Sequence, residues 1–277
     1  MVDGPQAMES ETPRPSRTAV AGFLRYAAGT LDLVSLSQDG ARVILRIREQ
    51  LNELDPDSAA KDRAIHANAA LAESELNRDF PLLNAQALMG LWGALEACVD
   101  DVCVDWLMES GGSGARESMQ RIRVPLADAY FLEEPDRSQQ VLEWLKADQG
   151  SELKRGVGQF ESVLKSVGLK GSVDPHVRTL LHYAKAMRNV VAHRGGRVDK
   201  RALEDLPGNL GLTEGESLSI GTGQLFALAS AMVVYVEDLR YRARVAAAEQ
   251  AIPPGLPPWV ESTELLLADF SRRRPSS

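Results

Sequence analysis

The sequence predicts an all-α fold: an antiparallel helical bundle with extra N-terminal helices and, at most, one small β-hairpin. Apolar residues recur at alternating steps of three and four over several long segments, which is the spacing of helices that pack in a bundle. Stretches that alternate apolar and polar residues, as half-buried strands do, are almost absent. With 277 residues, 44% of them hydrophobic, the chain is long enough to bury one large core.

The chain divides into four predicted parts. Residues 1–20 are polar and rich in Pro, Ser and Glu, and they lack the basic start and apolar centre of a secretory signal, so we expect a disordered leader. Residues 21–79 form a predicted N-terminal helical extension, and residues 80–250 form the bundle. Residues 251–277 are a tail rich in Pro and Arg, in which the prolines interrupt any helix.

Within the N-terminal extension the apolar spacing predicts two helices over residues 21–54. The break between them is expected at Ser37-Gln38-Asp39-Gly40, a cluster typical of turns. Residues 55–58, with the sequence Asp-Pro-Asp-Ser, predict a second turn that starts another helix reaching about Asn77.

The clearest helix of the sequence runs from Phe80 to Met108. Six residues form its apolar seam: Leu88, Trp92, Leu95, Val99, Val102 and Trp106. The glycine-rich run 110–114 that follows predicts a flexible linker, because it lacks the Gly-Lys-Ser/Thr of a phosphate-binding loop.

The middle of the bundle is less regular in sequence. A short mixed stretch occupies residues 122–132, and a helix is predicted over 137–147. A second three-four seam over residues 153–167 ends at Gly168 and predicts another bundle helix.

The next helix has clear signals at both ends. Asp174 is the expected N-cap with Pro175 at the first helical position, and Gly195-Gly196 ends the helix. Its expected buried stripe is Val177, Leu180, Ala184, Met187 and Val191.

After these glycines we expect a short helix over residues 200–206 and an extended piece over 210–220 that would fit a two-stranded hairpin. The last long helix is predicted from Thr222 to about Gln250.

Charge and cysteine content limit the partners and the cellular compartment that we expect for the protein. The formal net charge of −8 excludes bulk electrostatic coating of nucleic acid, so an anionic partner must meet a local patch. Cys98 and Cys103 point about 140° apart on one helix, which predicts two unbridged thiols and a reducing, cytoplasmic compartment. The longest apolar run, residues 225–236, is too short to cross a bilayer, so no membrane contact is expected.

Three polar residues near the end of the Asp174–Gly195 helix form the candidate site. A helical wheel places Arg188 about 60° from the centre of the buried stripe, and Asn189 and His193 about 160° away. Asn189 and His193 are four residues apart and therefore nearly stacked, with Arg188 beside them. A guanidinium and an imidazole arranged in this way can meet a phosphate together.

A basic island surrounds these residues in an otherwise acidic chain. It consists of Lys185, Arg188, Arg194, Arg197, Lys200 and Arg201, with only Asp199 against them. Its cations could bind the phosphates of RNA. Alternatively, they could stabilise the C-terminus of the helix through its macrodipole.

The spacing Arg188, four residues, His193, with Asn189 directly after the arginine, resembles the signature of the HEPN superfamily. The position of this signature, near the end of a long helix and ahead of a final long helix, is similar to the layout of that family. Residues 92–101 also resemble the early helix of several HEPN families, in which an acidic residue faces the signature. The resemblance covers roughly residues 80–250.

The resemblance implies an all-α protein that pairs with a second copy, so that two signatures meet in a cleft, and many members are metal-independent endoribonucleases. His193 would be the acid/base residue, Arg188 would stabilise charge on the phosphate, and Asn189 would orient or bind it. Glu96 would hold Arg188 or His193, unless it is simply a solvated carboxylate at the edge of its helix. By analogy we expect a role in bacterial defence or as a toxin, with RNA, a second copy and an antitoxin or defence-system protein as partners, and no cofactor.

Three other functions are compatible with a helical chain. The first keeps the HEPN fold as a non-catalytic module that binds a nucleotide, RNA or a partner protein. A carboxylate-bridged metal enzyme is disfavoured because the sequence has neither Glu-x-x-His pairs nor His-Glu-x-x-His. A helix-turn-helix regulator would need a basic recognition helix, and none stands out.

Overall fold

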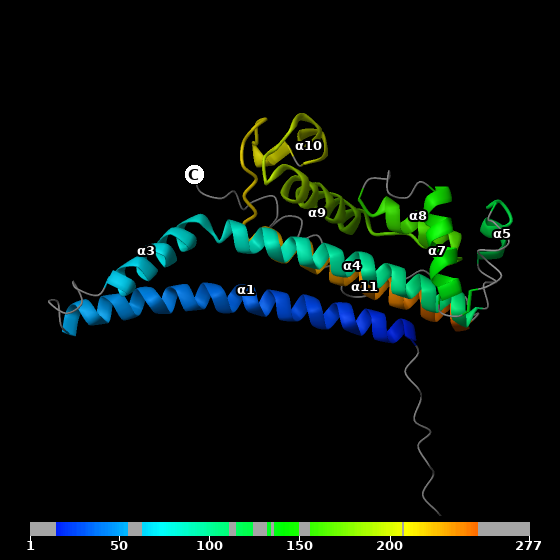
Figure 1. Ribbon diagram of the computed structural model, residues 1–277, viewed down its shortest axis with the longest axis horizontal. Coiled ribbons are helices and arrows are strands. Elements are labelled where there is room, and N and C mark those ends of the chain that lie inside the picture. The colour runs from blue at the N-terminus through cyan, green and yellow to red at the C-terminus, as the bar shows by residue number, and fades with distance from the viewer. Residues whose placement is uncertain are drawn as a thin grey trace, which may run out of the picture.

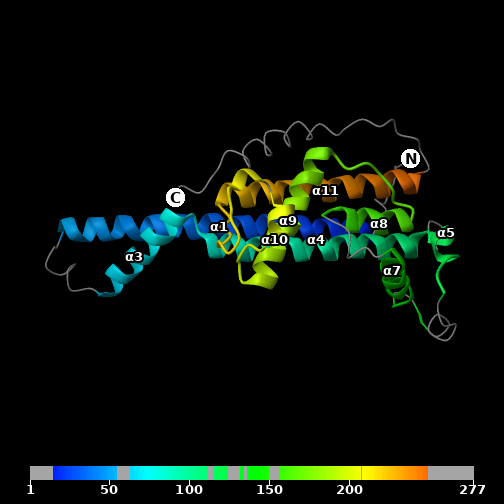
Figure 2. The same cartoon turned by 90° about the horizontal axis from the view of Figure 1, so that it is seen from above.

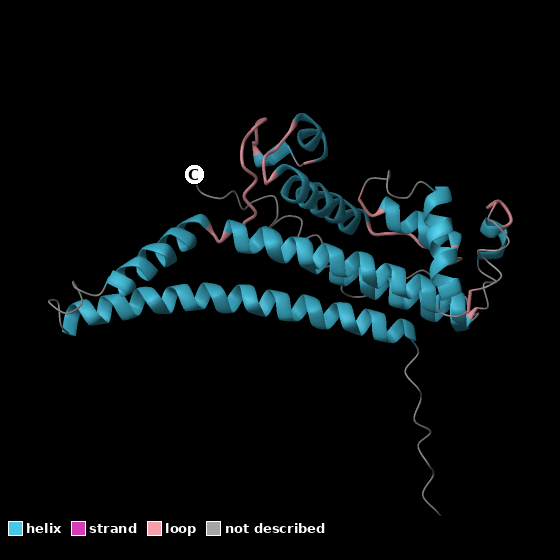
Figure 3. Cartoon of the chain, viewed as in Figure 1, coloured by secondary structure: helices cyan, strands magenta, loops and turns pink. Residues whose placement is uncertain are grey.

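The computed structural model describes residues 15–54, 63–110, 115–123, 132–133, 136–149, 156–206 and 208–248. These residues are predominantly helical and contain no strand, which confirms the all-α prediction (Figure 3). The helices are α1 (Pro15–Leu54), α3 (Arg63–Arg78), α4 (Pro81–Glu109), α5 (Arg116–Met119), α7 (Asp136–Gln149), α8 (Gly158–Ser166), α9 (Pro175–Arg194), α10 (Lys200–Asp205) and α11 (Thr222–Ala248), with a 3-10 turn at Gly208–Leu210.

The three longest helices, α1, α4 and α11, lie side by side along the long axis of the molecule (Figures 1 and 2). Helix α1 runs antiparallel to the other two, but α4 and α11 run parallel to each other. Both begin at the same end, where the backbone N–H and the hydroxyl of Thr222 donate to the carboxylate of Asp79 at 2.8 and 2.7 Å. The prediction of an antiparallel bundle is therefore wrong for this pair, because the segment between them returns the chain to the starting end.

Helix α1 is one continuous helix of 40 residues, so the predicted break at residues 37–40 is wrong. Val34 and Ala41, seven residues apart, are both buried and keep the same face of α1 against the core across the proposed break. Locally, the Ser37 hydroxyl donates to the carbonyl of Leu33 at 2.8 Å, and Arg42 pairs with Asp39 at 2.7 Å. Turn-forming residues on the solvent side are thus outweighed by burial on the other side.

The start of α1 also corrects the predicted leader. Residues 15–20 belong to the helix, and Val20 is 1% exposed. Val20, Phe23 and Ala27 share one core with α4, α9 and α11, so residues 21–79 contribute to the same core as residues 80–250. A smaller cluster of Ala41, Ala72 and Phe80 holds α3 against the second half of α1.

Helix α4 is the central element and confirms the seam expected from its sequence. Five of the six predicted seam residues, Leu88, Trp92, Leu95, Val99 and Val102, are at most 1% exposed. The sixth, Trp106, is partly buried. Asp79 and Phe80, just before the helix, adopt left-handed backbone conformations with φ of 58° and 53°. This costly corner persists because the Asp79 side chain caps α11 and Phe80 is buried.

Helix α9 lies across α4 and α11, on the side opposite to α1 (Figures 1 and 2). Its ends are those that the sequence predicts: the Asp174 carboxylate accepts from the N–H groups of His176 and Val177, and Gly195 ends the helix at φ 58°. Val177, Leu180, Ala184 and Met187 are buried against the two long helices. The remaining predicted stripe residue, Val191, is partly buried.

The extended piece at residues 210–220 does not form a hairpin with itself. Its later part pairs instead with the segment after α9, through one isolated antiparallel bridge between Arg197 and Ser217. The Leu218 N–H donates to the carbonyl of Gly196 at 2.7 Å, and the Val198 N–H donates to the carbonyl of Glu216 at 2.9 Å. This pairing fixes the chain directly beyond the candidate site.

Several predictions lie outside the described residues: most of the leader, the turn at 55–58, the glycine linker 111–114, most of 122–132 and the tail. The helix predicted over 153–167 begins at Gly158, and residues 151–155 are also outside the described part. One described helix, α1, is long and apolar enough to cross a membrane, with a mean hydropathy of 1.2 in its most apolar window. A core helix of a soluble protein passes the same test, and the inner face of α1 is part of the core.

A buried charged network joins α8 to the end of α11. The Arg242 side chain, 7% exposed, lies 2.9 Å from the carboxylate of Glu161 and 2.6 Å from that of Asp238. The Tyr235 hydroxyl donates to Glu161 at 2.8 Å, and burial raises the pKa of this phenol well above its usual value. The network holds in place α8, the helix that contacts the start of the candidate site.

We expect Arg242→Ala to lower the free energy of unfolding by about 3 kcal/mol or more, because two partly buried carboxylates lose their cation. Urea unfolding followed by circular dichroism measures the change. Arg240→Ala is the matched control: Arg240 pairs with Glu237 at the surface, so its loss should cost less than about 1 kcal/mol. Equal costs for both variants would contradict a structural role for the buried network.

Candidate functional site

The last turns of α9 bring together the three polar residues that the sequence singles out. Arg188 Nη1 donates to Asn189 Oδ1 at 3.2 Å and lies 3.5 Å from His193 Nε2. Arg188 and Asn189 are half-buried, whereas His193 is exposed. The helix places them as the wheel predicts, because positions 188, 189 and 193 lie outside the stripe that packs on α4 and α11.

The contact between Arg188 and His193 has a chemical consequence. A guanidinium can only donate hydrogen bonds, so the contact is a hydrogen bond only in the tautomer whose Nε2 carries a lone pair. The same lone pair is the one that could accept a proton from a ligand. At 3.5 Å the contact is at the outer limit of a hydrogen bond, which leaves room for a ligand oxygen to come between the two groups.

A cavity of about 300 Å³ lies next to these residues, between α9 and α10. Asn189 and His193 line it from α9, and Arg201 lines it from α10. Two carboxylates, Asp199 and Asp205, line the same cavity, so it is less basic than the sequence suggests. Arg188 is not part of its wall.

The cations of the basic island have different roles in the structure. Lys185 donates to the amide oxygen of Gln159 in α8, and Arg194 Nε lies 3.1 Å from Asp199. Arg197 Nη1 donates to the carbonyl of Gly215 at 3.1 Å. These three stabilise the fold locally, while Lys200 and Arg201 at the start of α10 are exposed.

Glu96 does not reach the site. Its carboxylate accepts from Trp92 Nε1 at 2.8 Å and from Gln159 Nε2 at 3.2 Å, in a separate cavity of about 280 Å³. The expected support of Arg188 or His193 is therefore corrected: Glu96 is linked to α9 through Gln159 and Lys185, one turn before Arg188. The sequence contains no signal for this link, because Gln159 comes from α8, more than sixty residues after Glu96.

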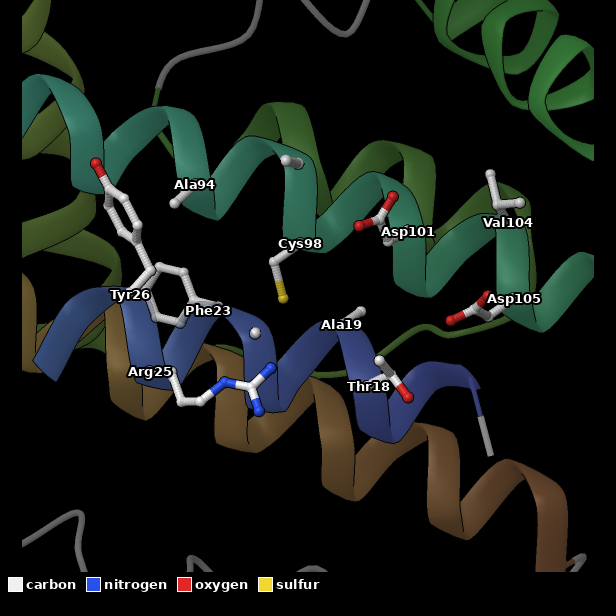
Figure 4. Close-up of a pocket in the computed structure, with 12 residues that line it drawn as sticks. Thr18, Ala19, Phe23, Arg25, Tyr26, Ala94, Cys98, Asp101, Val104 and Asp105 are labelled. Carbon is white, nitrogen blue, oxygen red and sulfur yellow. The ribbon is translucent and has the colours of Figure 1, made fainter. Parts of the chain in front are cut away.

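A larger cavity, about 650 Å³, is a groove between the first half of α1 and the outer face of α4 (Figure 4). Phe23 and Cys98 lie on its apolar floor, with Arg25 on one side and Asp101 and Asp105 on the other. It lies across α4 from the α9 residues and so belongs to a different surface (Figure 1). Its walls come from segments about 75 residues apart, which is why sequence spacing did not reveal it.

The two cysteines are buried and unbridged, as predicted. Burial raises the pKa of Cys98 to about 12, so its thiol is not a nucleophile at neutral pH. Among the described residues, no group of three or more His, Cys, Asp and Glu side chains could hold a metal ion.

Comparison with known proteins adds no relative to this description: no family model, no curated protein and no solved structure matches the chain.

Asp199 offers a test of how the site is held together. Its carboxylate accepts from the Ala202 N–H at 2.8 Å as the N-cap of α10, and it pairs with Arg194. We expect Asp199→Ala to lower the free energy of unfolding by about 1 kcal/mol and to speed hydrogen exchange in α10. Glu204→Ala on the exposed face of the same helix is the control and should leave exchange unchanged. Normal protection of α10 in the Asp199 variant would contradict its capping role.

The groove gives a prediction about pH. Burial, followed by the charges of Asp101 and Glu109, raises the pKa of Asp105 to about 6. A raised pKa means that the folded state binds the proton more tightly, so this contribution to stability is complete below pH 3.8 and is lost as the pH rises through 6.

Asp105→Asn should therefore stabilise the folded protein at pH 8 by about 1 kcal/mol, a value that allows for solvent screening, and so raise its melting temperature. At pH 5 the gain should be much smaller. Thermal unfolding at the two pH values measures the difference. Asp148→Asn at the exposed end of α7 controls for the general loss of one negative charge. An equal gain for Asp105→Asn at both pH values would argue against the raised pKa.

Proposed function

We propose that this chain is a metal-independent endoribonuclease of HEPN type, working in the cytoplasm in bacterial defence or as a toxin. The observation that supports the proposal best is the 3.5 Å approach of Arg188 to His193 on the outer side of α9, with Asn189 bonded to the same guanidinium. The three side chains form one cluster next to an open cavity rather than three separate surface groups. Such a cluster contains the donors and the proton acceptor that cleavage of a phosphodiester needs.

The proposed reaction uses the nucleophile that RNA itself carries. The 2′-oxygen attacks the adjacent phosphorus as its proton passes to His193 Nε2, and the bond between phosphorus and the 5′-oxygen breaks. The leaving 5′-oxygen takes a proton, which the imidazolium can supply. The products are a 2′,3′-cyclic phosphate and a free 5′-hydroxyl, and Arg188 stabilises the charge that develops on the phosphoryl oxygens.

The charge around the site indicates how RNA would approach it. Asp199 and Asp205 repel phosphate from the interior of the cavity, whereas Arg201, which also lines it, is exposed, as is the adjacent Lys200. We therefore expect the RNA backbone to cross the rim of the cavity, so that one phosphate lies between Arg188 and His193. In this proposal the partners are RNA, a second copy of the chain, and an antitoxin or another defence-system protein.

The second candidate function is a binding module without catalysis. It is favoured by the use of Lys185, Arg194 and Arg197 in contacts within the chain, which leaves fewer cations for a long RNA. A nucleotide or a short acidic segment of a protein would need only Arg188, His193 and Arg201. The two functions differ in whether the imidazole must transfer a proton.

RNA cleavage assays on purified protein test the proposal. We expect wild-type protein to cut RNA in the presence of EDTA, and Arg188→Ala or His193→Ala to lower the rate at least about 100-fold while folding is retained. Arg178→Ala on an exposed part of α9 and His66→Ala on α3 are matched controls that should cleave like the wild type. A substrate with one 2′-deoxynucleotide at the cut position should resist cleavage there.

The outcomes separate the two functions. Retained RNA or nucleotide binding with no cleavage by the wild type would favour the binding module. Cleavage that persists in both Arg188→Ala and His193→Ala, or that EDTA abolishes, would contradict the proposed site.

A further inference from the structure

Helix α1 has a second apolar seam that faces away from the protein. Positions 22, 26, 29, 33, 36, 40, 43, 47, 50 and 54 follow alternating steps of four and three, and helical geometry places them about 130° from the buried face of α1. The large side chains on this outer seam are exposed by 45% to 83%: Tyr26, Leu33, Leu36, Val43, Ile47 and Leu54. Two described leucines outside α1, Leu71 and Leu82, are about as exposed as Leu33, but neither has such a series around it.

All three glycines of α1, Gly22, Gly29 and Gly40, fall on the same seam. A glycine inside a helix costs about 1 kcal/mol relative to alanine, so three of them need a reason. Packing within the chain is not that reason, because a Cβ at any of these positions would meet nothing within 4 Å. Missing side chains would allow another helix to come close to the backbone.

We propose that the outer seam of α1 is the interface with a second copy of this chain, in which the two α1 helices pack antiparallel. In an antiparallel pair, two seam positions face each other when their residue numbers add up to a constant, and this constant defines the register. With a sum of 76, Leu36 faces Gly40 of the second copy, Ile47 faces Gly29, and Leu54 faces Gly22. Each glycine then lies opposite a large side chain, as knobs-into-holes packing needs.

The other two layers of this register are also compatible. Leu33 faces Val43 of the second copy. Gln50 of the second copy lies beside the exposed part of Tyr26, whose hydroxyl points toward Gly90 of α4. Because the layers on the two sides of the symmetry axis are identical, the arrangement is the closed, two-fold type that homodimers commonly have.

The charges along one edge of the seam match the same register. The residues just before every second seam position, from 26 to 54, are Arg25, Asp32, Asp39, Arg46 and Glu53. In the antiparallel pair Arg25 lies beside Glu53 of the second copy, and Asp32 lies beside Arg46, so each symmetric dimer gains four pairs of opposite charge. Within the described chain, Arg25, Asp32, Arg46 and Glu53 form no ion pair. Asp39, which would lie beside Asp39 of the second copy at the symmetry axis, is already paired with Arg42 at 2.7 Å.

The size of the seam is sufficient for a dimer. From position 22 to 54 it is about 50 Å long, and at about 12 Å wide it would bury roughly 600 Å² of each copy. The total of about 1,200 Å² lies at the lower end of stable protein interfaces. The end of the groove beside Gly22 and Tyr26 continues this surface and would receive the second half of the partner helix (Figure 4).

A lipid bilayer is the other conceivable occupant of so apolar a helix. The charged edge argues for the second copy, since Arg25, Asp32, Asp39 and Arg46 would enter the bilayer with α1 at considerable cost. The proposal does not depend on the proposed ribonuclease function, because α1 and the α9 residues lie on opposite sides of α4 and α11 (Figure 1).

The dimer is tested first with the full chain in solution. Sedimentation or light scattering at micromolar concentrations should give twice the chain mass of 30.2 kDa. Leu36→Asp should raise the dissociation constant of the dimer at least tenfold. Leu71→Asp, which removes an equally exposed leucine from α3, should leave the dissociation constant unchanged. A wild-type monomer at about 100 μM, or a dimer that Leu36→Asp does not weaken, would overturn the proposal.

Charge exchange tests the register. Arg25→Glu alone should weaken the dimer, and the double variant Arg25→Glu with Glu53→Arg should restore it, because both positions then attract again across the interface. No recovery in the double variant would contradict the antiparallel register.

Disulfide formation tests the direction of the helices. The antiparallel register places residue 33 against residue 43 of the second copy, so Leu33→Cys and Val43→Cys proteins should form a disulfide when mixed and oxidised, but neither alone. Cross-linking of Leu33→Cys with itself would indicate a parallel pair. Binding of wild-type protein to liposomes that Leu36→Asp abolishes, with no dimer in solution, would assign the seam to a membrane instead.

Discussion

The wide buried face of α4 is the constraint on which the structure depends. Leu91, Trp92, Cys98 and Cys103 spread over about 140° of this helix, and all are at most 3% exposed. One helix cannot cover all these directions, so α1 packs on one side, α9 and α11 on others, and α7 and α8 near the C-terminal end. Each of these helices is needed because a large apolar area on α4 would otherwise face water.

The candidate site benefits from this packing without being part of it. Ala184, Met187 and Val190 anchor α9 to α4 and α11, which makes the helix a rigid support up to its last turn. Beyond Val190 the buried stripe ends, so His193 projects into solvent, and Gly195 reverses the chain toward α10. Rigid placement of an exposed imidazole next to a half-buried guanidinium is the kind of preorganisation that binding of a phosphate requires.

The molecule thus has two outward surfaces of different chemistry on opposite sides of α4. The α9 surface is polar, and it contains Arg188 and His193 next to a cavity with cations at its rim. The α1 surface is an apolar seam with a charged edge. If both surfaces bind a second copy, the chain has two independent two-fold interfaces, and closed assembly through both would give a tetramer of dihedral symmetry rather than a simple dimer.

Long apolar seams were predictable from the sequence because they depend only on helical periodicity, and this was sufficient for α4, α9, α11 and the all-α class. The caps Asp174 and Gly195 and the clustering of Arg188, Asn189 and His193 were predictable for the same local reason: they lie within one helix. By contrast, the break at residues 37–40 was wrong because local turn preference is weaker than the burial of Val34 in the main core and of Ala41 in the cluster with α3.

Only the tertiary structure decided what depends on segments that are distant in sequence. It brought Gln159 between Glu96 and Lys185, added Asp205 to the cavity beside His193, and made α4 and α11 parallel through the contact of Asp79 with Thr222. The sequence by itself determined which residues share a face of each helix, because that follows from a fixed turn angle. Which of those faces meet another helix, and which stay open, was determined only by how the other helices cover the wide apolar face of α4.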